Sequence, residues 1–167
     1  ELTLEYFKQE LPNYRVFDEK RYFSPGKGPG AFEVKGRKIA LTVCEDIWHT
    51  KAIRQASRRG ADLVLNLNAS PFHRNKGKER KELLGNHADK FQLPIVYANQ
   101  VGGQDELVFD GASMVVCPNS GLRVQLDSFK VDKRVVEFSV NSKGLLETKN
   151  TKTENRKDLE DVYDALV

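Results

Sequence analysis

The sequence predicts a layered α/β fold, and three observations support this prediction. Short apolar runs alternate with amphipathic segments through the middle of the chain, which is typical of strands covered by helices. The run 61–67 (ADLVLNL) is apolar along almost its whole length, as in a buried parallel strand. After Gly111, short apolar runs follow one another around an Asn-Ser-Gly turn, which indicates antiparallel pairing there.

The composition fits one globular domain. The chain has 167 residues, of which 39% are hydrophobic and 31% charged, and its net charge is only +3. This balance excludes binding to a polyanion through bulk charge, so we expect no nucleic-acid partner. No apolar run approaches the ~20 residues of a membrane span, so we expect no membrane partner. Two cysteines without a CxxC pair, and histidines without metal spacing, predict no metal site and a reducing cytoplasm.

The N-terminal part predicts a strand, a long loop and a hairpin. Residues 4–9 (LEYFKQ) have the pattern of a short strand, and Pro12 ends it because proline lacks a backbone N–H. Residues 14–30 form a long irregular stretch, which in a compact domain is usually functional. Strands are expected at 32–34 and 38–43, joined by a turn that contains glycine.

The middle of the chain predicts helix, strand, helix and strand. Residues 48–59 are apolar on one side and basic on the other, and Gly60 is a suitable residue to end that helix. The strand 61–67 follows, and then a basic loop at 73–81 merges into a second helix. The apolar face of this helix consists of Leu84, His87, Ala88 and Phe91. Residues 93–99 form the next expected strand.

The last third predicts strands and then a change of domain. Strands are expected at 113–117, 122–126 and 134–140. Residues 147–158 are polar without an apolar anchor, which is typical of a linker. Residues 159–167 have an apolar helical face, so a new helix is expected to begin there.

Cys44 is the sharpest candidate for a reactive group. It lies at the end of an expected strand and just before a helix, where open α/β sheets place their sites. Free N–H groups at a helix N-terminus can lower the pKa of a thiol. Glu45 and Asp46 place two carboxylates beside it, which calls for a nearby cation, and Lys8 is a candidate for that cation. A simply buried cysteine and a solvated Lys8 remain the alternatives.

Several other residues are weaker candidates. His49 lies five residues after Cys44, a spacing that points the two side chains apart, so we expect His49 to be a cap or surface residue rather than a catalytic partner. Cys117 lies within an apolar strand and is expected to be inert packing. The polar segments 103–106 and 109–113 interrupt apolar strands and fit either the rim of a site or a plain loop.

Five strings together resemble the glutamine amidotransferase domain of the glutamine-dependent NAD synthetases, a branch of the nitrilase superfamily. They are FKQELPNYRVFDEKRYF at 7–23, VCEDIW at 43–48, LNLNASPF at 65–72, NQVGGQDELVFDGAS at 99–113 and the terminal LEDVYDALV. The resemblance implies a nitrilase-like αββα sandwich, four-layered with mixed sheets and incomplete at the N-terminus. It assigns 1–146 to a partial glutaminase domain, 147–158 to a polar linker and 159–167 to the first helix toward a synthetase domain that is absent here.

The resemblance also implies a Glu–Lys–Cys triad. Lys8 matches the lysine and Cys44 matches the nucleophile. The glutamate of this family lies in the first third of the fold, and no residue of this sequence matches it. Glu45 and Glu106 are the glutamates nearest to the matching motifs, and neither fits the general-base motif.

Four more residues are implied to line the glutamine pocket: Tyr14, Glu45, Trp48 and Ser70. A carboxylate at Glu45 suits the α-ammonium group of glutamine. The implied reaction is hydrolysis of the glutamine amide through a cysteine thioester. The ammonia then serves the ATP-dependent amidation of nicotinic acid adenine dinucleotide to NAD. The glutaminase part needs no cofactor, whereas ATP and Mg²⁺ belong to the absent synthetase domain.

The implied partners are glutamine, the synthetase domain of the same polypeptide and further copies in a homo-oligomer, all in the cytoplasm. The fragment alone is expected to be inactive, because it lacks the base. Two alternatives remain at this point. One is a stand-alone nitrilase-type amidase, and the other is a non-catalytic, truncated remnant with a role in assembly.

Overall fold

A six-stranded mixed sheet forms the centre of the computed structural model, which describes residues 2–14, 16–151 and 158–166. Its strands, in spatial order, are β1 (Gly30–Val34), β2 (Arg37–Val43), β3 (Leu63–Asn68), β4 (Ile95–Asn99), β7 (Met114–Cys117) and β8 (Gly121–Gln125). The three central strands β2, β3 and β4 are parallel, and the other pairs are antiparallel. The sheet thus confirms the predicted α/β class, with parallel pairing in the middle and antiparallel pairing after Gly111.

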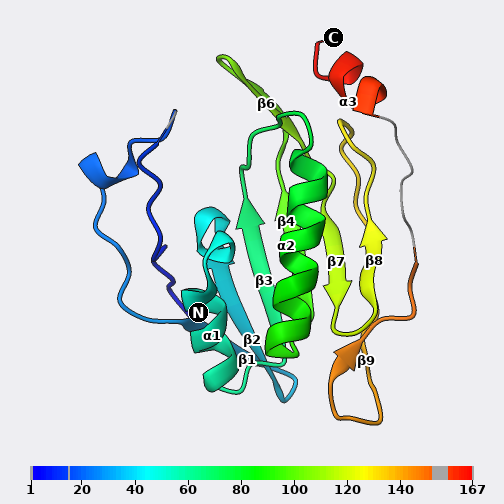
Figure 1. The fold of residues 1–167 in the computed structure, drawn as a ribbon. Helices are drawn as coiled ribbons and strands as arrows, with labels where there is room; N and C mark the ends of the chain where they lie inside the picture. Colours follow the sequence, from blue (N-terminus) through cyan, green and yellow to red (C-terminus); the bar gives the residue numbers. More distant parts are fainter. Residues whose placement is uncertain (1, 15, 152–157, 167) are drawn as a thin grey trace.

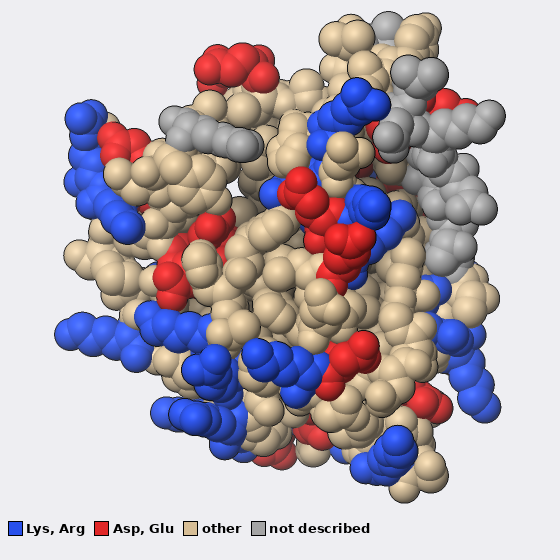
Figure 2. All heavy atoms as spheres, in the orientation of Figure 1, with Lys and Arg blue, Asp and Glu red and all other residues tan. Residues whose placement is uncertain are grey.

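Two helices, α1 (Thr50–Arg58) and α2 (Lys76–Phe91), cover one face of the sheet (Figure 1). The main core lies between them and the sheet, and its largest members are Ile47, Ile53, Val64, Leu84, Ile95, Tyr97 and Met114. The basic side of α1 points to solvent through Lys51, Arg54 and Arg58. Figure 2 shows basic side chains gathered over this helix, at the lower left of the view.

The opposite face of the sheet is only partly covered. A second apolar cluster consists of Val115, Cys117 and Val124, with Val96, Leu126, Val136 and Phe138 packed against it. Toward the other edge, Val34 and Leu67 are 45% and 53% exposed on this face. Within the described residues, no second sheet packs over these side chains. The described residues therefore form one helix layer and one sheet layer.

The remaining elements are short. They are η1 (Glu19–Arg21), η2 (Cys44–Trp48), β5 (Val101–Gln104), β6 (Leu107–Asp110), β9 (Ser139–Val140), β10 (Leu146–Glu147) and α3 (Asp158–Asp164). Strands β5 and β6 pair as a separate hairpin that projects beyond the end of β4 (Figure 1). The polar insertion predicted at 103–106 is the tip of this hairpin.

The strand predicted at 4–9 is wrong, because the segment is irregular in the structure. The backbone N–H groups of Gln9 and Glu10 donate to one carboxylate oxygen of Asp46, at 2.9 and 2.8 Å. A side chain therefore takes the donors that a neighbouring strand would need. The sequence pattern shows which residues are apolar, but it does not show that the distant Asp46 carboxylate accepts these two hydrogen bonds.

Several further boundaries differ from the predictions. The helix expected at 48–59 begins only at Thr50, because the single 3-10 turn η2 comes first. The helix α2 already begins at Lys76, inside the expected basic loop. The strand expected at 134–140 is reduced to Ser139–Val140, since the segment before it covers the sheet through side chains instead of pairing with it.

The predicted linker, 147–158, lies largely outside the described residues, since 152–157 are not described. Its first residue, Glu147, belongs to β10, and helix α3 begins at Asp158. The division into domain, linker and following helix stays a prediction.

Candidate active site

Cys44 lies at a sharp turn between β2 and η2. It is the first residue of η2 and has a φ of 45°, an uncommon value for a residue other than glycine. Ser70 follows β3 closely, and Asn99 is the last residue of β4. Because the carboxyl ends of parallel strands meet at one edge of a sheet, these three residues come together there.

A pocket of about 200 Å³ opens at this edge and includes Cys44. Its lining residues are Tyr14, Val16, Phe17, Cys44, Glu45, Trp48, Ser70, Pro71, Phe72, His73, Lys76 and Leu107. All four residues predicted to contact substrate, Tyr14, Glu45, Trp48 and Ser70, are among them. The pocket is smaller than the ~300–1,000 Å³ usual for drug-sized ligands, so it suits a molecule of amino-acid size.

Lys8 does not line this pocket, but it lies within electrostatic reach of Cys44. Its ammonium lowers the pKa of the Cys44 thiol electrostatically. The Lys8 Nζ lies 2.7 Å from both carboxylate oxygens of Glu19, and only 15% of the Lys8 side chain is exposed. The solvated alternative for Lys8 is therefore wrong.

Glu19 was missed by the sequence analysis. It lies in the irregular segment 14–30, where no periodic pattern identifies a site residue. The available signal was its position in the same family-like string, 7–23, as Lys8. The Glu19 carboxylate raises the pKa of Cys44, which opposes the effect of Lys8, so both charges lie within electrostatic reach of the thiol.

The pKa of Cys44 is raised above its ordinary value, chiefly because the thiol is largely buried. Lys8 opposes this rise without reversing it. Lys8 and the backbone N–H of Glu45 both lower this pKa, as expected for a cation and for the start of a helix, but burial outweighs them. A thiol that is protonated at neutral pH needs a base to become a nucleophile.

Glu45 and Asp46, adjacent in sequence, have different roles in the structure. Glu45 lines the pocket, accepts a hydrogen bond from the Tyr14 hydroxyl at 2.8 Å, and lies 3.4 Å from Nε2 of His49. His49 is thus a half-exposed neighbour of Glu45, and its side chain makes no capping hydrogen bond to α1.

Asp46 is fully buried and holds the N-terminal segment. It accepts hydrogen bonds from the backbone N–H groups of Gln9, Glu10 and Val43 and from the Tyr6 hydroxyl at 2.7 Å. Burial raises the pKa of Tyr6, and the hydrogen bond to Asp46 raises it further. Four donors satisfy the buried carboxylate, so it does not need the cation that its position beside Cys44 had suggested.

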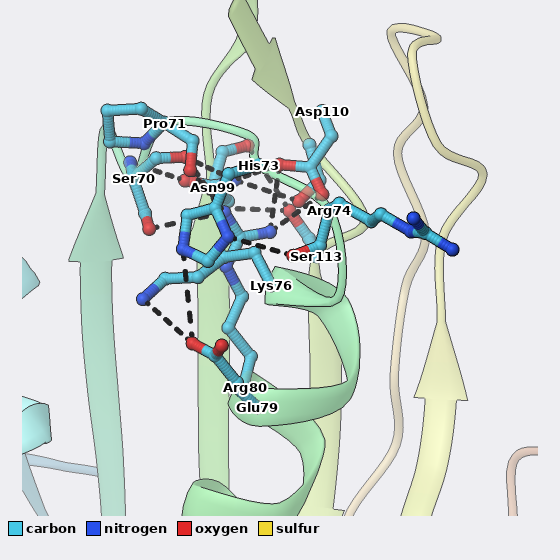
Figure 3. A network of polar contacts seen from close by, with 11 residues as sticks. Ser70, Pro71, His73, Arg74, Lys76, Glu79, Arg80, Asn99, Asp110 and Ser113 are labelled. Carbon is cyan, nitrogen blue, oxygen red and sulfur yellow. Dashed lines mark hydrogen bonds and ion pairs between the residues drawn. The ribbon is translucent and has the colours of Figure 1, made fainter. Parts of the chain in front are cut away.

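A buried ion pair holds Ser70 on the other side of the pocket (Figure 3). Nη1 of Arg80 lies 2.8 and 2.7 Å from the two carboxylate oxygens of Asp110. Nη2 of Arg80 donates to the carbonyl oxygen of Ser70 at 2.9 Å and to its hydroxyl at 3.2 Å. The side chain of Asn99 accepts the Ser70 N–H at 2.9 Å. Arg80 and Asn99 together fix every polar group of Ser70.

Arg80 and Asp110 were also missed by the sequence analysis, which placed Arg80 in the basic loop at 73–81. The available signal was helical spacing. Arg80 precedes Leu84 by four residues, so it shares the buried face of α2. Its buried charge is acceptable because Asp110 and the Ser70 oxygens pair with it.

The remaining candidates lie apart from the pocket. Glu106 is exposed at the tip of the β5–β6 hairpin, whereas its neighbour Leu107 lines the pocket. Cys117 is buried within β7, as predicted.

The structure thus combines a mixed sheet covered by helices on one side with a cysteine on a strand-end turn, within electrostatic reach of a lysine–glutamate pair. The chain matches the carbon-nitrogen hydrolase family over residues 2–141. It belongs to this family.

Within this family, the chain is similar to glutamine-dependent NAD(+) synthetases. The glutamine-dependent NAD(+) synthetase of Acinetobacter baylyi is 43% identical over 138 residues, which is 83% of this chain and 26% of that protein. The enzyme of the same name from Aquifex aeolicus is 45% identical over 128 residues, or 76% of this chain and 23% of that protein. The chain thus spans about a quarter of the length of these curated relatives.

Solved structures also resemble the fold, including one from Acinetobacter baumannii and one from Nesterenkonia. Glutamine-dependent NAD+ synthetase from Acinetobacter baumannii, solved with ADP, has a TM-score of 0.87 and 41% identity, covering 95% of this chain and 30% of that one. An amidase of the nitrilase superfamily from Nesterenkonia has a TM-score of 0.62 and 32% identity, covering 73% of this chain and 45% of that one. The fold is therefore that of the nitrilase superfamily, as predicted.

No described helix combines the length and apolar character that crossing a membrane requires. Both cysteines are free thiols.

Proposed function

We propose that this chain forms most of a glutaminase site that releases ammonia from glutamine through Cys44. The observation that carries the proposal is that Cys44 shares one small pocket with Tyr14, Glu45, Trp48 and Ser70, while Lys8 lies within electrostatic reach of the thiol. The names of the similar NAD synthetases give the substrate that the proposal adopts.

In the proposed reaction, the Cys44 sulfur attacks the side-chain amide carbon of glutamine. The C–N bond breaks, the amide nitrogen takes a proton and leaves as ammonia, and a thioester remains. Water then cleaves the C–S bond, which releases glutamate and restores the thiol. Lys8 stabilises the negative oxygen of each tetrahedral intermediate, and Glu19 holds the Lys8 ammonium in place.

The base that accepts the Cys44 proton is proposed to be a glutamate from outside these 167 residues. Glu19 is committed to the Lys8 ammonium, and Glu45 accepts the Tyr14 hydroxyl. The uncovered sheet face around Val34 and Leu67 is proposed to pack against a second sheet from the same outside segment. The 167-residue chain alone is then inactive.

We further propose that the ammonia serves a synthetase domain of the same polypeptide. That domain would amidate nicotinic acid adenine dinucleotide to NAD with ATP and Mg²⁺, and the glutaminase part would use no cofactor. A homo-oligomer in the cytoplasm completes the proposal. Analytical ultracentrifugation of the natural protein tests the assembly, and a single monomer peak would contradict it.

A stand-alone amidase is the second candidate, because the Nesterenkonia amidase shares the fold at 32% identity. Structures of that amidase have acrylamide or the acetamide moiety of fluoroacetamide at the active-site cysteine. Ammonia release by the natural protein from glutamine and from acetamide separates the two candidates. The glutaminase proposal expects glutamine to be strongly preferred, and the Cys44→Ala variant to lose this activity while NAD synthesis from free ammonium continues. Preference for acetamide would favour the amidase.

A further inference from the structure

Lys8 is held at its backbone as well as at its side chain. Its ammonium pairs with the Glu19 carboxylate. Its carbonyl oxygen accepts a hydrogen bond from the backbone N–H of Gly26 at 2.8 Å. Glu19 and Gly26 both belong to the irregular segment 14–30, whose length predicted a function. This one segment therefore contacts Lys8 at both ends of the residue.

Gly26 approaches the N-terminal segment so closely that no side chain fits between them. A Cβ atom added to Gly26 would overlap the carbonyl oxygen of Phe7, and it would lie 2.8 Å from the Phe7 carbonyl carbon. Real Cβ atoms essentially never come within 3.0 Å of such atoms. The φ of Gly26 is not in the left-handed region, so its conformation would admit alanine. Lack of space, rather than conformation, thus requires glycine here.

Gly28 lies two residues further along the same run, SPGKGPG at 24–30, and differs from Gly26 in this respect. Its carbonyl oxygen accepts a hydrogen bond from Nε2 of Gln9 at 3.3 Å. A Cβ atom added to Gly28 would meet nothing within 4 Å, and its φ is not in the left-handed region either. Of these two glycines, only Gly26 is required by a close approach.

The overlap at Gly26 falls on the residue that directly precedes Lys8. Because the overlapped atom is the backbone oxygen of Phe7, a rearrangement of the Phe7 side chain would not relieve it. On the other side of Lys8, the Asp46 carboxylate holds the backbone N–H of Gln9 at 2.9 Å. A side chain at position 26 would therefore displace the backbone at Lys8 relative to its anchor.

We propose that Gly26 is a positioning residue, which places the Lys8 ammonium relative to Cys44 by letting the two backbones pack directly against each other. This inference rests on the role of Lys8 in the proposed glutaminase function. A methyl group at position 26 would separate the segments by about 1 Å, and a misplacement of that size can lower a reaction rate about 10²-fold. Substrate binding should change little, because neither Gly26 nor Lys8 lines the Cys44 pocket.

An alanine at each of the two glycines tests this assignment in the natural full-length protein. Gly26→Ala should lower kcat with glutamine about 10- to 100-fold and leave the KM for glutamine unchanged. NAD synthesis from free ammonium should continue, because it bypasses the glutaminase. Gly28→Ala is the matched control and should behave like the parent protein. Lys8→Met is the reference for complete loss of the ammonium.

The pH profile of Cys44 alkylation by iodoacetamide separates misplacement of Lys8 from a general loss of structure. Lys8 lowers the pKa of the Cys44 thiol, so its displacement should shift the profile to higher pH. The shift in Gly26→Ala should have the same direction as in Lys8→Met and be smaller. Cys117 is only 1% exposed, so its protection from alkylation in each variant shows that the sheet is folded.

A parent-like kcat and pH profile in Gly26→Ala, or equal losses in Gly26→Ala and Gly28→Ala, would overturn the assignment. If Cys117 becomes reactive in Gly26→Ala, that variant is misfolded and Gly30→Ala replaces it. The Cβ atom added there meets ring carbon Cδ2 of Tyr6 at 2.5 Å, a side-chain contact that yields more easily. Gly30→Ala should show the same shift to a smaller extent, and a parent-like profile would then overturn the assignment.

Two other results would refute the basis of this inference instead. Parent-like turnover of glutamine by Lys8→Met would contradict the proposed role of Lys8, and this inference would be wrong with it. A parent protein that releases no ammonia from glutamine would refute the proposed function itself.

Discussion

The two walls of the Cys44 pocket are built in different ways. The N-terminal wall, formed by Tyr14, Val16 and Phe17, lies in a segment without helix or strand. The Ser70 wall, formed by residues 70–72, joins β3 to α2 and is held by buried Arg80. Tyr14 and Val16 are about half exposed, whereas Ser70 and Arg80 are buried.

Each wall depends on one buried charge, but the two charges are satisfied differently. Asp46 anchors the N-terminal wall through four hydrogen bonds, three of them from backbone N–H groups. Arg80 anchors the Ser70 wall through an ion pair with Asp110 and through the Ser70 oxygens. We infer that the Ser70 wall is the stable part of the pocket, and that the N-terminal wall opens more readily.

The largest expected effect is a loss of stability in the Ser70 wall. Arg80→Met leaves Asp110 buried without its partner, and breaking a buried ion pair on one side costs about 3–5 kcal/mol. Hydrogen exchange of the natural protein should show the loss as faster exchange in α2 and β7. The control variant Arg74→Met changes an exposed residue, so the amides of α2 and β7 should exchange at the parent rate in it. An unchanged α2 in Arg80→Met would show that this wall does not depend on the ion pair.

The second effect, a loss of catalytic rate, concerns Lys8, which is paired with Glu19 and lies within electrostatic reach of Cys44. Removing one oxyanion-stabilising donor typically lowers kcat about 10²–10³-fold, so Lys8→Ala should cause that loss with glutamine. NAD synthesis from free ammonium should continue, because it bypasses the glutaminase. Lys20→Ala, an exposed lysine in η1, is the matched control. Near-normal use of glutamine by Lys8→Ala would remove Lys8 from the site.

The third effect tests directly whether the two walls open independently of each other. In Asp46→Asn an amide nitrogen replaces one carboxylate oxygen and faces donors from Tyr6 or Val43, which costs about 1–3 kcal/mol. Hydrogen exchange of the backbone amides should become faster in residues 6–19 and stay unchanged in α2. If α2 exchanges faster as well, the two walls form one cooperative unit and the contrast between them is wrong.

The smallest effect is a change in pH dependence. Burial raises the pKa of Cys44 and Lys8 lowers it, so the thiolate fraction should still be rising with pH above the range of an exposed cysteine. The rate of alkylation by iodoacetamide, measured on the 167-residue chain, should follow this rise. Lys8→Met removes the favourable charge and should shift the profile to higher pH. A shift to lower pH would contradict the placement of Lys8.

Local patterns predicted the elements that bury their own apolar residues. The continuous run in β3 and the helical spacing in α2 both became buried core, and the glycine-containing turn joins β1 to β2. The family-like strings led to Cys44, Lys8 and the four pocket residues, and the structure brings the pocket residues together around Cys44. Their roles in substrate binding stay predictions.

The anchors of the walls could not be predicted in the same way. Asp46 holds Gln9 from 37 positions away, and Arg80 meets Asp110 from 30 positions away. Neither pairing leaves a periodic pattern in the sequence. Residues 4–9 were predicted as a strand because their composition suits one, but Asp46 takes two of their donors.

The central claim is that Cys44 is the reacting group of a glutamine pocket, and labelling of the two cysteines tests it most directly. The natural protein is treated with a glutamine-analogue electrophile, and the modified peptides are identified by mass spectrometry. We expect the label on Cys44, with Cys117 unmodified because it is only 1% exposed inside the sheet. Excess glutamine should protect Cys44. Label found mainly on Cys117, or label that persists in Cys44→Ala, would contradict the account.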